Sequence, residues 1–530
     1  MTIVGDFDIH LTVYEPQSGK LTAFGTEHGL KVTHIVLDRG TYVLQPMLTL
    51  TGSGTLDDQL ALAAAWRERL RAAGLDVQRV KVEAAPWNEG VPRTDVEAAD
   101  EPPVCTGPSY WDGRDRPERY FEHHVKLLLP DDAVERLVAL TDLVAPHGTR
   151  LSRVARRRRP DGREERFATQ RCHGVGRETA MARLDALVAD LRAAGHEIVE
   201  VEQEYVVHDT ALHYDRGWLE PARARHDPLR PAAPAGADKY PATYLPLPTG
   251  EEVEQSQVFD PAMKHHSNAY RPGEPRFADP ATGARWRQAR ATARNHVLTL
   301  IADSAWAESL VLRGSVTMPA WIGDDAREPG DIDFVVLPPE RSLRSADAAR
   351  MFDDVLAAVR AAPGAGLDAD GALGEDIWTY ERADGRRLVI PFAVDGVPPG
   401  AVQLDFVFGE PLPIPPAPLH LPSIDRVVLA ATAELSLAWK LLWLGTDLYP
   451  QGKDLYDATL LAERTGVPSL SLVRDLLRPE LAGAADAFTA ESVLAWDVDW
   501  SGFRDAHPDL PADDDHWTRR LALALDAAWR

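Results

Sequence analysis

The sequence contains very little cysteine: Cys105 and Cys172 are the two cysteines among 530 residues. So few thiols, far apart in the chain, exclude a disulfide framework and a thiolate zinc cluster, and they fit a reducing cytosol. The sequence also lacks an apolar run of membrane-spanning length. Its first residues show neither a basic segment nor a long apolar segment, so we predict a cytoplasmic protein with no signal peptide and no membrane partner.

Positive charge is scarce too. The chain has 57 Lys and Arg against 82 Asp and Glu, a formal net charge of −25. This balance disfavours nucleic-acid binding by the whole surface but allows a local basic patch. Hydrophobic residues at 45% and aromatic residues at 7% are globular values. The length is too great for one core and predicts about two to four domains.

The N-terminal part carries an internal duplication. Residues 120–130 resemble residues 7–16, and residues 177–204 resemble residues 56–83, with the same LRAAG at the end of each predicted helix. Strand-like segments at 8–13, 32–37, 42–50 and 77–83 surround the first helix, at 56–73. A repeat of this length is one structural unit used twice. We therefore predict two ferredoxin-like, βαββ-type halves at 1–90 and 119–214, joined by a linker at 91–118.

An arginine-rich hairpin is predicted between two strands of the second half. The turn signal Pro160-Asp161-Gly162 follows four consecutive arginines, Arg156, Arg157, Arg158 and Arg159. Two interpretations remain open. The first, slightly favoured, is a solvated hairpin whose arginines pair with an acidic surface. The second is a contact with the phosphate backbone of RNA or DNA.

The duplication also places His10 opposite His124. The segments His10-Leu11-Thr12 and His124-Val125-Lys126 resemble the paired H-x-T/S strands of the 2H phosphoesterases, although the second copy lacks the hydroxyl residue. One alternative function is therefore an N-terminal 2H-like phosphoesterase. A strand histidine is more often a packed residue than a catalyst.

The composition and the hydrophobic periodicity of the chain change after the duplicated segments. Residues 215–282 are rich in Pro and acidic residues and predict a linker. We expect a compact domain at 283–465, with helices at 285–304 and 346–361 and strands at 377–381, 387–394 and 401–408. Apolar spacing at 473–477, 484–495 and 517–529 predicts a helical subdomain over 466–530.

The stretch from Leu310 to Leu337 has the clearest chemical pattern. An apolar run ends on Gly314-Ser315, and a second apolar run begins directly after Asp331-Ile332-Asp333. Alternation along a strand puts the two aspartates on one face. Carboxylates this close repel unless a cation lies between them, and Mg²⁺ prefers such oxygen ligands. The small turn lets backbone N–H groups approach a phosphate, so the pattern predicts a metal-dependent nucleotide site.

A third carboxylate, Asp405, lies inside the apolar strand AVQLDFVF. A lone buried aspartate is costly unless it is paired with a cation or binds a metal. We expect its strand to lie beside that of Asp331 and Asp333. Pairing with a buried arginine is the alternative.

This set of residues resembles the nucleotidyltransferase superfamily, and the longer set resembles the AbiEii/AbiGii toxin family of bacterial nucleotidyltransferases. Arg327 precedes Asp331 by four residues, Lys440 lies on a predicted apolar helix at 427–444, and a late motif runs from Lys453 to Asp457. The resemblance covers residues 290–470. Three positions depart from the family pattern: Ser315 stands where the family usually has a second glycine, Pro329 stands at a hydroxyl position, and Gln451 replaces a common arginine.

The resemblance implies a polymerase-β-like fold with a helical C-terminal part, which gives the whole chain an α+β class. It implies that Asp331 and Asp333 hold two Mg²⁺ ions on the triphosphate of an NTP, and that Asp405 binds the catalytic metal. The nucleotide-binding residues it implies are Gly314, Ser315, Arg327, Lys440, Lys453, Asp454 and Asp457.

The resemblance also implies partners. The substrate would be ATP, GTP, CTP or another NTP, the acceptor tRNA or another RNA, and the system a toxin with a cognate antitoxin. An alternative from a different class is a catalytically inactive protein that binds a nucleotide or RNA. Intact Asp331, Asp333 and Asp405 favour the enzyme.

Overall fold

The computed structural model shows an α+β protein, as predicted, with two compact units: Met1–Arg223 with Ala490–Asp497, and Ala224–Thr489 with Val498–Arg530. The structure describes residues 2–39, 42–102, 104, 119–154, 159, 161–215, 217–219, 243, 253–255, 257–258, 269–270, 275–379, 383–447, 450–500, 503–504, 507, 509–511 and 513–530. Cys105, and most of the predicted linkers at 91–118 and 215–282, lie outside these residues. No helix of this described part is long and apolar enough to cross a bilayer.

The N-terminal unit uses one order of elements twice. The first half consists of β1 (Val4–Val13), α1 (Ser18–His28), β2 (Lys31–Leu37), β3 (Leu44–Thr55), α2 (Leu56–Ala72) and β4 (Val77–Ala84). The second half consists of β5 (Tyr120–Leu129), α4 (Val134–Val144), β6 (Thr149–Val154), β7 (Glu164–His173), α5 (Arg177–Ala193) and β8 (Glu197–Asp209). Helix α1 is not among the predicted elements, because its apolar residues are few and its burial is limited to Leu21 and Gly25.

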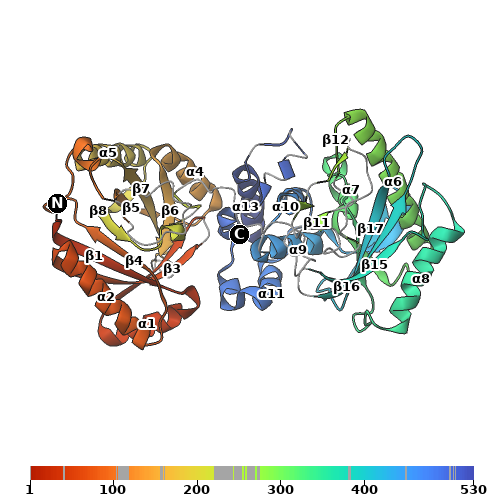
Figure 1. The fold of residues 1–530 in the computed structure, drawn as a ribbon, viewed down its shortest axis with the longest axis horizontal. Helices are drawn as coiled ribbons and strands as arrows, with labels where there is room; N and C mark the ends of the chain where they lie inside the picture. The colour runs from red at the N-terminus through yellow and green to blue at the C-terminus, as the bar shows by residue number, and fades with distance from the viewer. Residues whose placement is uncertain are drawn as a thin grey trace. The chain divides into compact units, whose positions relative to one another are not determined.

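The eight strands close into a barrel in the order β1-β3-β2-β6-β7-β5-β8-β4. The two halves join through antiparallel pairs, β2 with β6 and β4 with β8. The helices cover the outside of the barrel wall (Figure 1). Alternate residues such as Ile9 and Leu11 pack in an apolar core that also contains Leu21 and Leu70 of the helices. Because strand side chains alternate, the intervening residues face the barrel interior.

The C-terminal unit is built on a seven-stranded sheet in the order β15-β16-β17-β14-β13-β19-β18. Its strands are β13 (Leu310–Arg313), β14 (Ile332–Val336), β15 (Leu373–Thr379), β16 (Ala383–Phe392), β17 (Gly400–Phe408), β18 (Ala417–Leu421) and β19 (Arg426–Ala430). Helices α6 (Pro280–Ala302) and α8 (Ala346–Ala361) pack with the sheet around Phe334, Phe406 and Met351.

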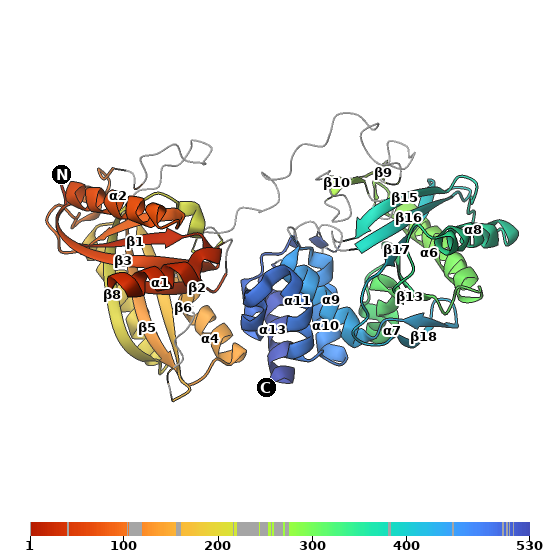
Figure 2. The same cartoon turned by 90° about the horizontal axis from the view of Figure 1, so that it is seen from below.

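A group of helices completes this unit (Figure 2): α9 (Ala433–Thr446), α10 (Gly452–Arg464), α11 (Leu470–Leu481) and α13 (Asp515–Trp529). Two predictions are corrected here. The predicted helix at 427–444 is a strand, β19, followed by α9, because Ala430 pairs with Leu312 of β13 and the Thr432 side chain caps α9. The segment 484–495 forms two 3₁₀ helices, Ala482–Ala487 and Ala490–Ala495, instead of an α-helix.

Candidate nucleotidyl-transfer site

The turn after β13 requires a glycine. Gly314 has φ +75°, and a Cβ atom built on it would lie 2.4 Å from Asp333 Oδ2. This close approach lets the turn lie directly against the carboxylate. Ser315 follows at the start of a 3₁₀ helix (Gly314–Thr317) and is 3% exposed. Its hydroxyl has no hydrogen-bond partner in the described structure, so it is a buried polar group left for a ligand.

Asp331 directly precedes β14 and Asp333 is the second residue of that strand, next to this turn. Asp333 is in register with Arg313 of β13. The loop that leads into Asp331 is held from α6, because the Arg290 guanidinium donates to the carbonyl oxygens of Pro329, at 2.9 Å, and Gly330. These hydrogen bonds fix the backbone directly before Asp331.

Asp405 completes a group of three carboxylates. β17 runs parallel to β14, and Asp405 is in register with Asp333. One carboxylate oxygen from each of Asp331, Asp333 and Asp405 lies within 4.8 Å of the others. The structure thus brings together the three carboxylates that the sequence singled out. Their binding of a metal remains a prediction.

The charge in this group is only partly compensated. Burial raises the pKa of Asp333 well above its usual value, and Asp331 and Asp405 raise it further, against the opposing effect of Arg313. Asp405 instead accepts a bidentate pair from Arg387, with Nε at 2.8 Å and Nη2 at 2.6 Å. Asp405 therefore has a buried arginine partner, and its binding of a metal stays a prediction. Asp405 Oδ2 also accepts from Gln403 Nε2, at 3.2 Å.

A second charged cluster joins α9 and α10. Lys440 is 3% exposed, and its Nζ lies 2.9 Å from both Asp454 Oδ1 and Asp457 Oδ2. Arg327 donates to Asp457 through Nε, at 3.1 Å, and Nη2, at 3.0 Å. Burial alone would lower the pKa of Lys440, but the two aspartates raise it. The charge of Lys440 is therefore balanced within the protein. This arrangement favours a role in positioning α10 over direct contact with a triphosphate.

Lys453 is a second lysine whose charge acts on the carboxylate group. It is the second residue of α10 and is half-buried, and its charge lowers the pKa of both Asp333 and Asp454. It is therefore better placed than Lys440 to meet an anion beside Asp333.

Sequence reasoning did not find three arginines of this site. Arg387, Arg313 and Arg290 are buried and hold Asp405, Glu410 and the loop before Asp331, respectively. An arginine in an otherwise apolar strand, such as Arg313 in β13 (LVLR), was the available signal, because a buried guanidinium requires an acidic partner.

Two sets of candidates lie in the N-terminal unit. Arg156, Arg157 and Arg158 are outside the described residues, while Arg159 pairs with Glu165, with Nε 3.0 Å from Oε1. His10 and His124 hydrogen-bond to threonines in register on the neighbouring strands, β3 and β7.

A 660 Å³ cavity in the same unit is lined by five carboxylates: Asp6, Asp8, Glu83, Glu202 and Glu204. An acidic lining repels a phosphodiester, so the phosphoesterase prediction gains no support from it, and it remains untested.

The comparison with known families agrees with the geometry of the C-terminal unit. Residues 296–527 match the family model described as nucleotidyl transferase AbiEii toxin, Type IV TA system. The matched region contains the carboxylate group and the α9–α10 cluster, so the C-terminal region carries a nucleotidyl transferase domain of the AbiEii family. No curated protein matches the chain.

Proposed function

We propose that the protein is a Mg²⁺-dependent nucleotidyltransferase that moves an NMP from an NTP to an acceptor hydroxyl. The observation that carries the proposal is the group of Asp331, Asp333 and Asp405 on adjacent strands, with ligand oxygens within 4.8 Å of one another. Its excess negative charge and its all-oxygen donors fit a hard divalent cation. We further propose that the C-terminal unit has a polymerase-β-like fold and that the barrel halves are ferredoxin-like repeats.

The proposed reaction is an in-line displacement at the α-phosphorus. The acceptor oxygen bonds to phosphorus, the bond from the α-phosphorus to the bridging oxygen breaks, and pyrophosphate leaves; the hydroxyl proton passes to a carboxylate or to water. Mg²⁺ held by Asp331, Asp333 and Asp405 would neutralise the triphosphate and lower the pKa of the acceptor hydroxyl.

Other residues of the site would bind and position the substrate. The unpartnered Ser315 hydroxyl and the backbone of the Gly314 turn would bind a phosphate oxygen. Lys453 would neutralise the adjacent charge, while Arg387 holds Asp405 in one orientation. A residue that hydrogen-bonds to a metal ligand in this way fixes the direction of the ligand's lone pairs.

The family description supports a toxin that acts with an antitoxin. We propose tRNA or another RNA as the acceptor and a separately encoded antitoxin as the partner. The acceptor can be tested with all four NTPs in parallel, before the preferred nucleotide is identified.

The test incubates the purified protein with each α-labelled NTP, Mg²⁺ and total RNA, and then separates the labelled RNA by size. We expect label from one or two NTPs to appear in a discrete RNA class. The double variant Asp331→Asn/Asp333→Asn should transfer none, and the exposed Asp395→Asn, in the same unit, serves as the matched carboxylate control.

Equal transfer by the wild type and the double variant would refute the proposal. Tight NTP binding by calorimetry without transfer to RNA or to any component of a cell extract would instead support the inactive binding protein. Chelation with EDTA followed by Mg²⁺ restoration separates metal dependence from a general loss of folding.

A further inference from the structure

The barrel interior contains a histidine–threonine pair in each half. His10 Nδ1 lies 3.0 Å from Thr49 Oγ1, and His124 Nδ1 lies 2.9 Å from Thr169 Oγ1. Each threonine is in register with its histidine on the neighbouring strand. The duplication has therefore retained an oriented imidazole in both halves, and a partner at one ring nitrogen is how proteins direct the other nitrogen toward a ligand.

The second ring nitrogen of His10 faces a carboxylate. His10 Nε2 lies 2.8 Å from Glu83 Oε2, and Glu83 is 2% exposed. If Nδ1 carries the proton and donates to Thr49, a lone pair on Nε2 points at a carboxylate oxygen. That contact is favourable when a proton or a metal cation lies between the two atoms.

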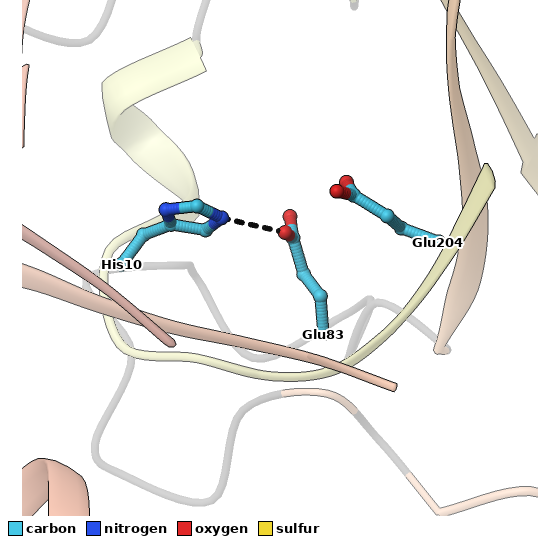
Figure 3. Close-up of side chains that lie close together, drawn as sticks. All are labelled: His10, Glu83 and Glu204. Carbon is cyan, nitrogen blue, oxygen red and sulfur yellow. Dashed lines mark hydrogen bonds and ion pairs between the residues drawn. The ribbon is translucent and has the colours of Figure 1, made fainter. Parts of the chain in front are cut away.

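Glu204 of β8 brings a second carboxylate to the same place. Figure 3 shows its carboxylate directed toward that of Glu83. One ligand atom each of His10, Glu83 and Glu204 lies within 4.8 Å of the others. Glu204 Oε2 is buried, and it lies 3.3 Å from His124 Nε2, with which it forms an ion pair when that histidine is protonated.

The equivalent set in the second half is already occupied by protein cations. Glu122 accepts from Lys81, at 2.5 Å, through one oxygen and from Arg171 through the other. Lys81 also contacts Glu83, but through Oε1, which leaves Oε2 directed at His10. In the first-half set, His10 Nε2 is the partner of Glu83 Oε2, and Glu204 belongs to both sets.

The adjoining cavity also favours a cation. Its five carboxylates, Asp6, Asp8, Glu83, Glu202 and Glu204, include two of the three candidate ligands, and among the described residues that line it none is basic. A volume of about 660 Å³ gives a metal ion a path from solvent and space for further water ligands. The resulting field attracts cations and repels free phosphate.

We propose that the barrel binds one divalent transition-metal ion through His10 Nε2, Glu83 Oε2 and Glu204 Oε2, with Thr49 positioning His10. One imidazole nitrogen and two carboxylate oxygens suit Zn²⁺ or Mn²⁺ better than Mg²⁺, for which oxygen ligands are preferred. Water from the cavity would complete the coordination. The site is separate from the carboxylate group of the C-terminal unit.

The test uses the full chain with Asp331→Asn and Asp333→Asn, so that the C-terminal carboxylates do not contribute bound metal. Zn²⁺ and Mn²⁺ binding are measured by calorimetry, and bound metal is counted by mass spectrometry after dialysis. We expect one ion per chain. Glu204→Gln and, separately, His10→Asn should weaken binding by at least about 100-fold, and Thr49→Val by about 10- to 100-fold. Glu200→Gln, an exposed glutamate on the same strand, should bind as the parent does.

Replacement by Co²⁺ gives a readout independent of stoichiometry, because its visible spectrum reports nitrogen and oxygen ligation. His10→Asn should change the absorption bands, and Glu200→Gln should not. A parent chain that binds none of these metals would overturn the proposal, as would unchanged affinity in both Glu204→Gln and His10→Asn. Circular dichroism identifies a variant that fails to fold, in which case the other variant decides. Loss of RNA labelling would not affect this outcome, so the two proposals can fail separately.

Discussion

Both units of the protein bury a group of carboxylates, and the two units compensate that charge differently. In the barrel, Arg79 donates to both Asp209 and Asp215, and Arg171 donates to Asp215 and Glu122. In the C-terminal unit, Asp331, Asp333 and Asp405 have ligand oxygens within 4.8 Å of one another, and the pKa of Asp333 is raised well above its usual value.

The pKa values of Asp215 and Asp333 shift in opposite directions, in line with this difference in charge compensation. Burial alone would raise the pKa of Asp215, but Arg79 and Arg171 lower it well below the usual value. A paired carboxylate stabilises the fold, whereas a crowded one destabilises it until a cation arrives. The barrel network is therefore mainly structural, apart from Glu204, and the C-terminal group is prepared for a ligand.

Asp333→Asn gives the largest expected effect. Transfer should fall by more than about 10³-fold, beyond the loss usual for a single oxyanion-hole donor. The stability of the metal-free protein should not fall. A raised carboxyl pKa means that stability is lost as pH rises from the unfolded value of about 3.9 through the folded value, so removing the charge should raise Tm at pH 7 in EDTA. Transfer assays and thermal melts with and without Mg²⁺ measure both effects.

The control for this variant is Asp395→Asn, for which transfer and Tm should match the wild type. Mg²⁺ should raise the Tm of the wild type but not that of Asp333→Asn, because binding to the native state alone stabilises it. A lower Tm for Asp333→Asn in EDTA would show that the carboxylate is a structural partner and would remove the contrast between the units.

Asp215→Asn tests the barrel and should act in the opposite direction. Removing one member of a buried ion network leaves Arg79 and Arg171 short of a partner and should cost about 3–5 kcal/mol at pH 7. The wild-type contribution is present above the unfolded pKa of about 3.9 and is lost as pH falls toward the depressed folded value. Hydrogen exchange of the barrel strands, between pH 7 and 3, measures the difference.

Labelled RNA yield provides the separate readout for Asp215→Asn. Where the variant remains folded, its transfer at low temperature should equal that of the wild type. If the stability difference between variant and wild type stays constant down to pH 3, Asp215 is not the paired, low-pKa group described above.

Arg387→Lys sharpens the comparison inside the C-terminal unit. Lysine keeps the charge beside Asp405 but loses the planar bidentate geometry. We expect transfer to fall by about 10- to 100-fold, the usual cost of losing a residue that orients a metal ligand, with kcat affected more than the KM for NTP. If Arg387 acts by directing Asp405 toward the metal, raising the Mg²⁺ concentration about tenfold above that of the standard assay should restore part of the lost transfer rate. Arg386→Lys, its exposed-side neighbour paired with Asp376, is the matched control.

Sequence reasoning located the carboxylates of the C-terminal unit because their positions follow from strand alternation. Asp331 and Asp333 are two residues apart, and Asp405 interrupts an apolar strand. The arginines that hold these groups could not be assigned, because register decides which guanidinium meets which carboxylate. Arg387 faces Asp405 only through the β16–β17 pairing.

The barrel was harder to predict for a related reason. The repeated segments were visible in sequence, but barrel closure depends on the β2–β6 and β4–β8 pairs, which join residues far apart in the chain. Strands such as β4, with Lys81 and Glu83 alternating with Val80 and Val82, resemble ordinary half-exposed strands. Closure turns that polar face inward, so Glu83 and Glu204 become candidate ligands only once the fold is known.

The smallest expected effect concerns Arg159, the described member of the arginine run. Its side chain is 35% exposed and is paired with the buried Glu165, so part of its charge is already used within the barrel unit. Such a partly screened pair contributes at most about 1 kcal/mol to stability. We expect Arg159→Ala to bind tRNA within about twofold of the wild type, measured by fluorescence anisotropy at low salt. A residue that does contact a phosphate would, when removed, also reduce the dependence of log affinity on log salt concentration by about one.

The matched control is Arg163→Ala, because Arg163 is likewise paired with a carboxylate of the hairpin, Asp161. A tenfold loss of tRNA affinity in Arg159→Ala alone, with a shallower salt slope, would assign the hairpin to RNA and make the barrel unit the reader of the acceptor.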